Sequence, residues 1–299
     1  MIKMEGVAAF VAVTEAGSIS EAARRLRLAK SVVSERLAEL EREVSAPLIH
    51  RTTRRLSLTE DGAAFLERAK RILDEARAAT ADLAERRGTL AGPLRLAAPV
   101  TFGRMHLAPA LIPFLKQHPA IELQLDLDDR RVDIASEGYD AVLRHGPIVE
   151  SRLIVWRLAT SRRLLVAAPD YLAANGTPAT LDDLSDHRGL FYAHRGAADW
   201  RFDTPDGSRI IRTEAALVTN NGDILLDAAV GGLGIALLPS FIAGEAVREG
   251  RLIVLDVGWS PAPEFVFMAH PEGRRSSAKL RALAAHLKAA FGDPPYWMI

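Results

Sequence analysis

Two stretches near the N-terminus combine long basic side chains with small hydroxyl side chains, a combination that suits contacts with duplex DNA. Basic groups pair with phosphates, while hydroxyls and arginines reach base edges in the major groove. The candidates are Ser18, Lys30, Ser31, Ser34 and Arg36 in the first stretch, and Arg51, Thr53, Arg54 and Arg55 in the second. The alternative is an ordinary solvated surface, because four glutamates between residues 35 and 43 would repel phosphate.

Helix-capping signals and the spacing of apolar residues predict the elements that carry these candidates. A first helix should cover residues 3–16 and end at Gly17, because glycine tolerates the left-handed conformation after a helix. Ser18 and Glu21 form a capping-box pattern that starts a short second helix over residues 19–26. A third, amphipathic helix over residues 30–44 completes a helix-turn-helix pattern. Residues 48–58 have apolar ends and a basic middle, which predicts a small β-hairpin, or wing.

A long helix is predicted next, from its N-cap Thr59 to about Arg87. Its apolar positions follow the alternating spacing of a heptad seam. The seam consists of Phe65, Ala69, Ile72, Ala76, Ala79 and Leu83. An isolated helix cannot bury such a seam, so the favoured partner is the same helix of a second copy. The alternative is a helix that packs on its own chain.

Beyond Gly88 and Gly92-Pro93 the pattern changes to alternating strands and helices, which predicts an α/β architecture. Strands are expected over residues 94–98, 121–127, 141–144, 164–168, 190–193, 216–219, 235–238, 252–255 and 265–269. Helices are expected over residues 102–117, 224–230 and 278–291. The apolar tail over residues 294–299 is expected to dock on its own domain, with a partner surface as the alternative.

The composition limits the class of protein. The chain has 299 residues, of which 48% are hydrophobic and 25% charged, and these values are typical of folded multidomain proteins. Basic and acidic residues balance at 38 each, so any DNA affinity must come from a local patch. The absence of cysteine excludes disulfides, thiolate zinc sites and thiol catalysis. The sequence shows neither a signal-peptide pattern nor a long apolar run, so we expect a cytoplasmic protein with no membrane contact.

The remaining polar residues form no catalytic constellation. Ser276 and Lys279 have the spacing of a serine–lysine acyl enzyme, but no companion motif is present. Capping of the last helix by Ser276 or Ser277 is the better interpretation. Gly232-Leu233-Gly234 precedes a strand, whereas a dinucleotide-binding loop follows one. His145 has no second ligand at metal-binding spacing, so we expect no enzyme activity, no cofactor and no metal.

Three N-terminal motifs, taken in order, resemble the LysR-type transcriptional regulators. They are Ser18-Ile-Ser-Glu-Ala-Ala-Arg-Arg-Leu, Ser31-Val-Val-Ser-Glu-Arg-Leu-Ala-Glu-Leu-Glu and Pro47-Leu-Ile-His-Arg-Thr-Thr-Arg-Arg-Leu-Ser-Leu-Thr-Glu-Asp-Gly. The resemblance is dense over the first 62 residues and resumes at residues 219–223 and 231–239. Three positions depart from the family pattern. Glu35 replaces a basic or polar residue, Ser45 replaces a common glycine, and Ala29 replaces the usual capping serine, which leaves Ser31 as a candidate cap.

The resemblance implies a multidomain fold. An all-α winged helix-turn-helix with a long linker helix would precede an α/β two-lobed domain like a type II periplasmic solute-binding protein. The three parts would be residues 1–58, 59–88 and 89–299, with lobe I at 89–161 and 268–299 and lobe II at 162–267. The chain would cross between the lobes near residues 161–164 and 262–267.

The resemblance also implies partners and a mechanism. The partners would be double-stranded DNA, a small-molecule effector, RNA polymerase, and further copies that form a homodimer through the linker helix or a homotetramer. Effector binding would change lobe closure and thereby the spacing of the DNA-binding heads.

By the same resemblance, the effector would lie between the lobes, where helix N-termini favour anions. The implied pocket residues are Val100, Thr101, Phe102, Arg144, His145, Trp200, Phe202, Thr219, Asn220, Asn221 and Phe267. We expect a small organic carboxylate held by Thr101 and Asn221, with a charge-assisted bond from Arg144. Trp200 and Phe202 would supply an aromatic wall. The alternative is that Thr101 caps its helix and Arg144 forms a structural ion pair.

Two other functions fit parts of the sequence. A free-standing solute-binding module or enzyme would use the N-terminal helices only to dimerise, and it would keep its activity after deletion of residues 1–58. A sequence-independent DNA-packaging protein is the second alternative, although the balanced charge of the chain argues against it.

Overall fold

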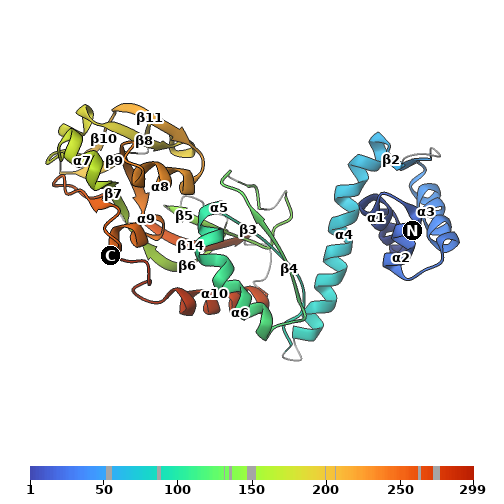
Figure 1. Ribbon diagram of the computed structural model, residues 1–299. Helices are drawn as coiled ribbons and strands as arrows, with labels where there is room; N and C mark the ends of the chain where they lie inside the picture. Colours follow the sequence, from blue (N-terminus) through green and yellow to red (C-terminus); the bar gives the residue numbers. More distant parts are fainter. Residues whose placement is uncertain are drawn as a thin grey trace. The chain divides into compact units, whose positions relative to one another are not determined.

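The computed structural model describes residues 1–299 except 52–55, 86–88, 131, 135–136, 147–152, 199, 206, 262–263 and 272–276. The chain divides into two compact units, Met1–Pro93 and Leu94–Ile299 (Figure 1). The first unit is mainly helical and the second is an α/β unit, as predicted; the second unit contains two five-stranded sheets.

The first unit contains the predicted helices and wing strands. They are α1 (Met4–Ala16), α2 (Ile19–Leu26), α3 (Lys30–Val44), β1 (Ile49–Arg51), β2 (Leu56–Leu58) and α4 (Glu60–Glu85). Gly17 ends α1 with a φ of 68°, and Ser18 Oγ accepts a hydrogen bond from the Glu21 N–H at 3.1 Å to cap α2. The capping box is only half formed, because the Glu21 carboxylate pairs with Arg24 and Arg25.

A shared apolar core fixes α3 against the other helices of this unit. Phe10 of α1 and Leu37 of α3 are both buried in it. Gly6 lets α1 and α3 approach closely, since a Cβ there would lie 3.1 Å from the Cβ of Leu40. Thr59 Oγ1 accepts a hydrogen bond from the Gly62 N–H at 2.9 Å, which confirms Thr59 as the cap of α4.

The first sheet of the second unit forms lobe I and has the strand order β4-β3-β5-β14-β6. The strands are β3 (Gly92–Ala98), β4 (Ile121–Leu127), β5 (Ala141–Gly146), β6 (Leu153–Ser161) and β14 (Glu264–Pro271). β3 and β5 are parallel, whereas β14 is antiparallel to both β5 and β6. The helices of this lobe are α5 (Val100–Phe102), the π-helical turn η1 (Gly103–Leu107), α6 (Ala108–Gln117) and α10 (Ala278–Phe291). α6 and α10 pack side by side (Figure 1).

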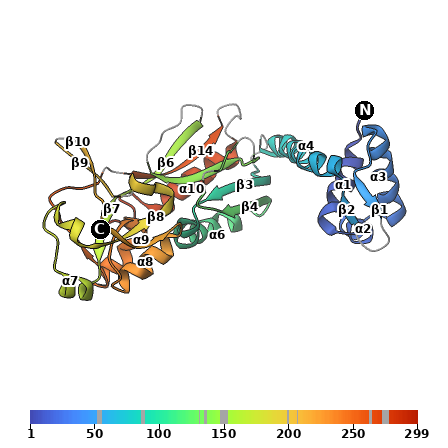
Figure 2. The ribbon, with the colours of Figure 1, turned by 90° about the horizontal axis from the view of Figure 1, so that it is seen from above.

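The second sheet forms lobe II and has the strand order β11-β8-β12-β7-β13. The strands are β7 (Arg163–Ala167), β8 (Arg188–Tyr192), β11 (Glu214–Thr219), β12 (Ile235–Pro239) and β13 (Ile253–Val254). The helices are α7 (Pro169–Asn175), α8 (Gly222–Val230), α9 (Ser240–Arg248) and the short 3-10 segments η2 (Asp183–Asp186) and η3 (Ala193–Ala198). The hairpin β9 (Arg201–Thr204) and β10 (Gly207–Ile210) projects from this lobe (Figure 2).

The chain passes between the lobes twice. The first crossing agrees with the prediction, whereas the second differs from the predicted lobe boundary. The first lies at Arg162, between β6 of lobe I and β7 of lobe II, inside the predicted range. The second returns to lobe I earlier than the predicted residue 268. Glu264 already pairs with Ser161 of β6, because residues 264–267 continue the same antiparallel ladder as the rest of β14.

Several elements of the second unit have no counterpart among the predicted ranges, including the helices α7 and α9 and the strands β6, β9 and β10. β6 presents an apolar run without the two-residue alternation that marks a half-buried strand. The β9–β10 hairpin turns at Pro205 and Gly207, residue types that favour turns, so its signal was present in the sequence.

The apolar C-terminal tail docks on its own unit, as expected. Trp297 is 2% exposed, and its ring centroid lies 5.2 Å from that of Phe291. Its indole N–H donates to the Thr160 carbonyl at 3.3 Å. The Tyr296 hydroxyl lies 2.6 Å from His106 Nδ1, so the tail is held by polar as well as apolar contacts.

Candidate functional sites

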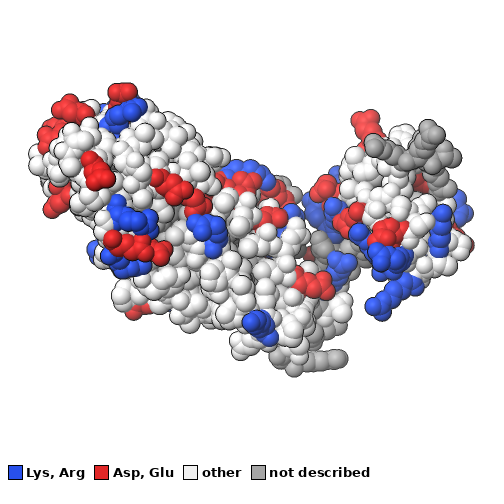
Figure 3. All heavy atoms as spheres, in the orientation of Figure 1, with Lys and Arg blue, Asp and Glu red and all other residues white. Residues whose placement is uncertain are grey.

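The N-terminal half of α3 presents the predicted hydroxyl and basic side chains. Lys30 and Ser31 are exposed, and Ser34 and Arg36 are half-buried. Ala29 occupies the N-cap position without a side-chain hydrogen bond, and Ser31 does not take over the role of cap. Basic side chains gather over α2 and α3 on the surface of this unit (Figure 3).

Three of the four glutamates on α3 bind their own chain. Glu39 and Glu43 both bind Lys3. The Lys3 ammonium group pairs with Glu39, and the Lys3 backbone N–H donates to Glu43 at 3.0 Å. Glu41 accepts hydrogen bonds from two successive backbone N–H groups, of residues 48 and 49, at 2.9 and 3.2 Å. Only Glu35 is fully exposed among the four. The acidic side chains therefore brace α3 against its neighbours, which weakens the objection that they would repel phosphate.

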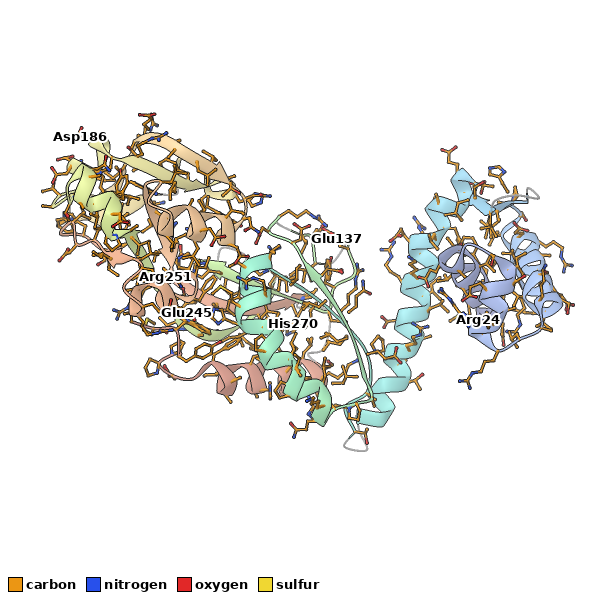
Figure 4. All side chains as sticks on the ribbon, in the orientation of Figure 1. Arg24, Glu137, Asp186, Glu245, Arg251 and His270 are labelled. Carbon is orange, nitrogen blue, oxygen red and sulfur yellow. The ribbon has the colours of Figure 1, made fainter. Side chains whose placement is uncertain are left out.

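Two further basic residues lie on α2 and were not among the candidates. The side chain of Arg24 is 79% exposed and that of Arg25 is 54% exposed (Figure 4, Arg24 labelled). Both pair with Glu21, at 2.7 and 3.3 Å. These are surface ion pairs between neighbouring helix turns, so they contribute little stability and leave the guanidinium groups accessible.

The wing is only partly described. β1 and β2 pair antiparallel, with Ile49 opposite Leu58. Arg51 ends β1, and the structure does not describe its side chain. Thr53, Arg54 and Arg55 lie outside the described residues, so their proposed DNA contacts stay predictions.

The heptad seam of α4 divides into a covered half and an open half. Ala69 is buried, and the ring of Phe65 lies 5.7 Å from that of Phe10 in α1. Ile72 is 41% exposed, and Ala76 and Ala79 are also exposed. The seam thus packs on its own chain at its N-terminal end, while the later positions offer an apolar face. The side chain of Leu83 is not described.

A cleft of about 1440 Å³ lies between the two lobes of the second unit. Thr101, Phe102, Arg144, His145 and Phe267 line it, as predicted for the effector pocket. The cleft exceeds the ~300–1,000 Å³ that small-molecule pockets usually occupy, so it has room for an organic ligand.

The other predicted pocket residues do not line the cleft; they are Val100, Trp200, Phe202, Thr219, Asn220 and Asn221. The aromatic wall is a wrong prediction. Trp200 and Phe202 are fully buried in the core of lobe II, where Trp200 packs against Phe191 with ring centroids 5.1 Å apart. Phe202 belongs to the unpredicted strand β9, and it points into this core because successive side chains of a strand alternate between its faces.

The polar groups predicted to hold an anion are bound to other groups of the protein. The Thr101 hydroxyl donates to Asp223 at 3.2 Å. Asn221 Oδ1 caps α8 by accepting the N–H groups of residues 223 and 224 at 2.9 and 3.0 Å. The Val100 N–H donates to Asp129 at 3.1 Å, and Arg144 donates to the carbonyl of residue 130 at 3.0 Å. Asp129 thus occupies the start of α5 and Asn221 the start of α8, so these groups do not form an open anion site.

The most deeply buried charges of the cleft meet where the chain crosses between the lobes. Both Nη atoms of Arg195, in η3 of lobe II, donate to Glu264 of lobe I, at 2.7 and 2.9 Å. His145 Nε2 lies 3.2 Å from the same carboxylate. Arg163 is 7% exposed and donates to the Leu237 carbonyl at 2.6 Å. The Arg195–Glu264 pair therefore joins the two lobes here, and His145 and Arg163 line the same cleft.

Burial and charge set the protonation states in this cluster. Burial lowers the pKa of His145 to about 4, and Arg195 and Arg163 act in the same direction against Glu264. Burial alone would raise the pKa of Glu264. The charges of His145, Arg195 and Arg163, with the hydrogen bonds from Arg195, outweigh it and lower that pKa. At neutral pH the cluster holds a neutral imidazole, one carboxylate and two guanidiniums.

The sequence analysis did not select Arg163, Arg195 or Glu264. Arg163 and Glu264 nevertheless lie inside the two stretches predicted to cross between the lobes. A charged residue at a predicted crossing is a usable signal, because both lobes shield that position from water. Arg195 has no comparable signal, since a kinked segment after β8 brings it to the cleft.

Ser277, which lies inside the candidate enzyme motif, has a structural role. Ser277 Oγ accepts the Leu280 N–H at 3.3 Å and caps α10, as predicted, while Ser276 is not described. Within the described residues, no three His, Asp or Glu side chains are grouped to hold a metal ion. Of the helices described, none is both long and apolar enough to cross a membrane.

Two matches to known families decide the assignment. Residues 4–63 match the bacterial regulatory helix-turn-helix protein, lysR family, and residues 87–292 match the LysR substrate binding domain. The chain belongs to the LysR family. It is therefore a LysR-type transcriptional regulator with a DNA-binding domain and a substrate-binding domain.

Similar LysR-type regulators span nearly the whole chain. The HTH-type transcriptional regulator DmlR of Escherichia coli (strain K12) is 33% identical over 287 residues, which cover 95% of this chain and 93% of DmlR. The structure of CrgA, a LysR-type transcriptional regulator from Neisseria meningitidis, has a TM-score of 0.57 and 31% identity, with 96% of each chain covered. The probable transcriptional regulator PA0477 from Pseudomonas aeruginosa has a TM-score of 0.68 at 18% identity, again over 96% of each chain, and shows the fold alone.

Proposed function

We propose that this LysR-type regulator binds a small organic carboxylate in the cleft between its lobes and that binding changes its hold on DNA. The observation that carries the proposal is the bidentate pair between Arg195 and Glu264 on the cleft wall, which joins the two lobes. A guanidinium at this position, already bound to a carboxylate of the protein, favours a ligand that offers the same group. The bidentate geometry of arginine suits a carboxylate in particular.

The anion site in this proposal differs from the one expected from sequence. Thr101 and Asn221 are already engaged, so the acidic group would bind near the junction, and Arg144 also lines the cleft wall. Phe102 and Phe267 line the same cleft and would contact the apolar part of the ligand.

Titration of the purified protein with a broad panel of organic acids, each paired with its neutral amide, tests this proposal. We expect saturable binding of one or more acids and none of the matching amides. Saturable binding of neutral or cationic compounds only would show that the effector is not a carboxylate.

The proposal for the first unit is that α3 enters the major groove and the wing follows the backbone. Lys30, Ser31, Ser34 and Arg36 would make contacts from α3, and Ser18 from the start of α2. Arg51, Thr53, Arg54 and Arg55 would make contacts from the wing. The exposure of Lys30 and Ser31 at the uncapped end of α3 supports this assignment.

The proposed domain bounds, oligomeric state and cellular compartment follow from the membership in the LysR family. The parts would be the head at 1–58, the linker helix at 59–88 and the effector domain at 89–299. Two copies would join through the open half of the α4 seam, and two dimers would form a tetramer. The regulator would act in the cytoplasm and contact RNA polymerase from a site that no residue identifies.

A further inference from the structure

Glu264 stands where an acidic ligand would have to bind in order to use Arg195. The two Nη atoms of Arg195 donate to the two carboxylate oxygens of Glu264, at 2.7 and 2.9 Å. Arginine offers this bidentate geometry to any carboxylate. The Glu264 side chain is 8% exposed, so this pair is shielded from water and from salt. The same two atoms of Arg195 cannot hold a second carboxylate while Glu264 remains in place.

We propose that Glu264 is a built-in counter-ion of Arg195 and that the carboxylate of the effector displaces it. This inference rests on the proposed function, because it requires an anionic ligand in the cleft. The exchange replaces one carboxylate on Arg195 by another, and no covalent bond or proton needs to move.

A displaced Glu264 would remain among other polar groups of the junction. His145 Nε2 lies 3.2 Å from its carboxylate, and Arg163 lines the same cleft. Both residues lower the pKa of Glu264, so they favour its charged form in the region that it would still occupy.

The exchange would also break a direct tie between the lobes. Arg195 belongs to η3 of lobe II, whereas Glu264 opens β14 of lobe I. Once Arg195 holds the ligand, its bidentate link to lobe I is lost, and the relative position of the lobes depends on the ligand instead. Glu264 therefore sets both the threshold for anion binding and the structural response to it.

Acetate is a suitable probe, because it consists of a carboxylate with a single methyl group and is small enough to fit any carboxylate site. The measurement is the Arg195 side-chain Nε–H signal in 15N-labelled full-length protein, identified by its loss in Arg195→Gln. The variants are Glu264→Gln, which keeps the size of the side chain but removes its charge, and the control Glu249→Gln. Glu249 forms an exposed pair with Arg251, and neither residue lines the cleft.

We expect acetate to shift the Arg195 signal saturably, with an affinity about tenfold or more higher in Glu264→Gln than in the wild type. Glu249→Gln should match the wild type, and acetamide should shift the signal in none of them. If Glu264→Gln does not fold, Glu264→Asp replaces it. Its shorter side chain keeps the charge but draws it away from Arg195, and it should also strengthen acetate binding.

Equal acetate affinity in the wild type and in the Glu264 variant would overturn the inference, and so would the absence of any acetate effect on Arg195. Either result could coexist with saturable binding of an organic acid elsewhere in the cleft. In that case the proposed function stands and only the role of Glu264 fails. The absence of binding across the acid panel would instead remove the proposed function.

Discussion

The two units use acidic side chains in opposite ways. On α3 of the first unit, Glu39, Glu41 and Glu43 bind the chain's own N-terminus and wing, and Lys30 and Ser31 at the start of this helix stay exposed. In the second unit, Glu264 and Asp223 bind the chain's own basic groups inside or beside the cleft. In the proposed functions, the head would therefore offer exposed groups to DNA, whereas the cleft would offer Arg195 only after a ligand displaces its internal partner.

This difference explains why one region was easier to read from sequence. The head is built from contacts within about 60 residues, so capping signals and helical periodicity placed Ser18, Gly17 and Thr59 correctly. The cleft brings together residues that lie far apart, and its key pair joins positions 195 and 264. Single-sequence patterns could locate the strands around them but could not show which side chains meet.

The largest predicted effect concerns packing in the second unit. Trp297→Ala should lower the free energy of unfolding of this unit by about 3–5 kcal/mol, because it empties a buried aromatic site in the tail. All four tryptophans, at 156, 200, 259 and 297, lie in this unit, so tryptophan fluorescence during urea unfolding reports on it alone.

Trp259→Ala serves as the matched control, since Trp259 is 42% exposed and its loss should cost about 0.5 kcal/mol or less. The helical circular dichroism transition of the first unit should stay the same in both variants. A Trp297 variant as stable as the Trp259 variant would mean that the tail is not part of the folded unit.

The next effect concerns the open half of the α4 seam. Ile72→Glu should weaken the dimer about a hundredfold, because it places a charge on the apolar face proposed to join two copies. Sedimentation velocity over a range of concentrations measures the change. Ala63→Glu is the control and should leave the dimer intact, because Ala63 is exposed on the opposite face of the same helix, nine residues or about two and a half turns earlier. An unaffected dimer in Ile72→Glu would favour a seam that serves only its own chain.

A third effect should distinguish the cleft from the head by pH. The folded protein holds the pKa of His145 at about 4, below its ordinary value, so only the unfolded chain takes up a proton between pH 6.5 and 4.5. Stability of the second unit should therefore fall as the pH falls through this window, by on the order of 2 kcal/mol.

The same fluorescence measurement at pH 7.5, 6.5, 5.5 and 4.8 checks this expectation, with the pH points chosen to bracket the titration. His145→Gln lacks the titrating ring and should show a flatter profile. Parallel profiles for the two proteins would contradict the assignment of a neutral buried imidazole at the lobe junction.

The smallest effects separate phosphate contacts from base contacts on α3. Lys30→Ala should weaken binding to all DNA sequences alike and reduce the salt slope of log K by about 1. Ser31→Ala should leave the salt slope unchanged and lower the preference for the specific site by about 1 kcal/mol. Fluorescence anisotropy at several salt concentrations measures both. The same salt slope in all three proteins would remove Lys30 from the proposed interface.

The errors of the sequence analysis concern the direction and the partners of side chains, which depend on the folded structure around them. Phe202 was assigned to the cleft because strand β9 was not recognised, and Trp200 directly precedes that strand. Without the strand, the direction of these side chains stayed undetermined. For Thr101 and Asn221, the sequence analysis predicted the starts of their helices correctly but not the role of their side chains. Their hydrogen-bond partners came from other parts of the chain, and a local pattern carries no information about those partners.

The most direct test of the account is the affinity of the purified protein for its own upstream intergenic DNA, compared with scrambled DNA of the same length. Salt must be fixed near the physiological value, because the phosphate contribution alone changes affinity by orders of magnitude. The account predicts a preference of about a thousandfold or more for the native fragment, together with a change in that affinity when a binding organic acid is added. Equal, weak binding to both DNAs, unaffected by any acid, would contradict it.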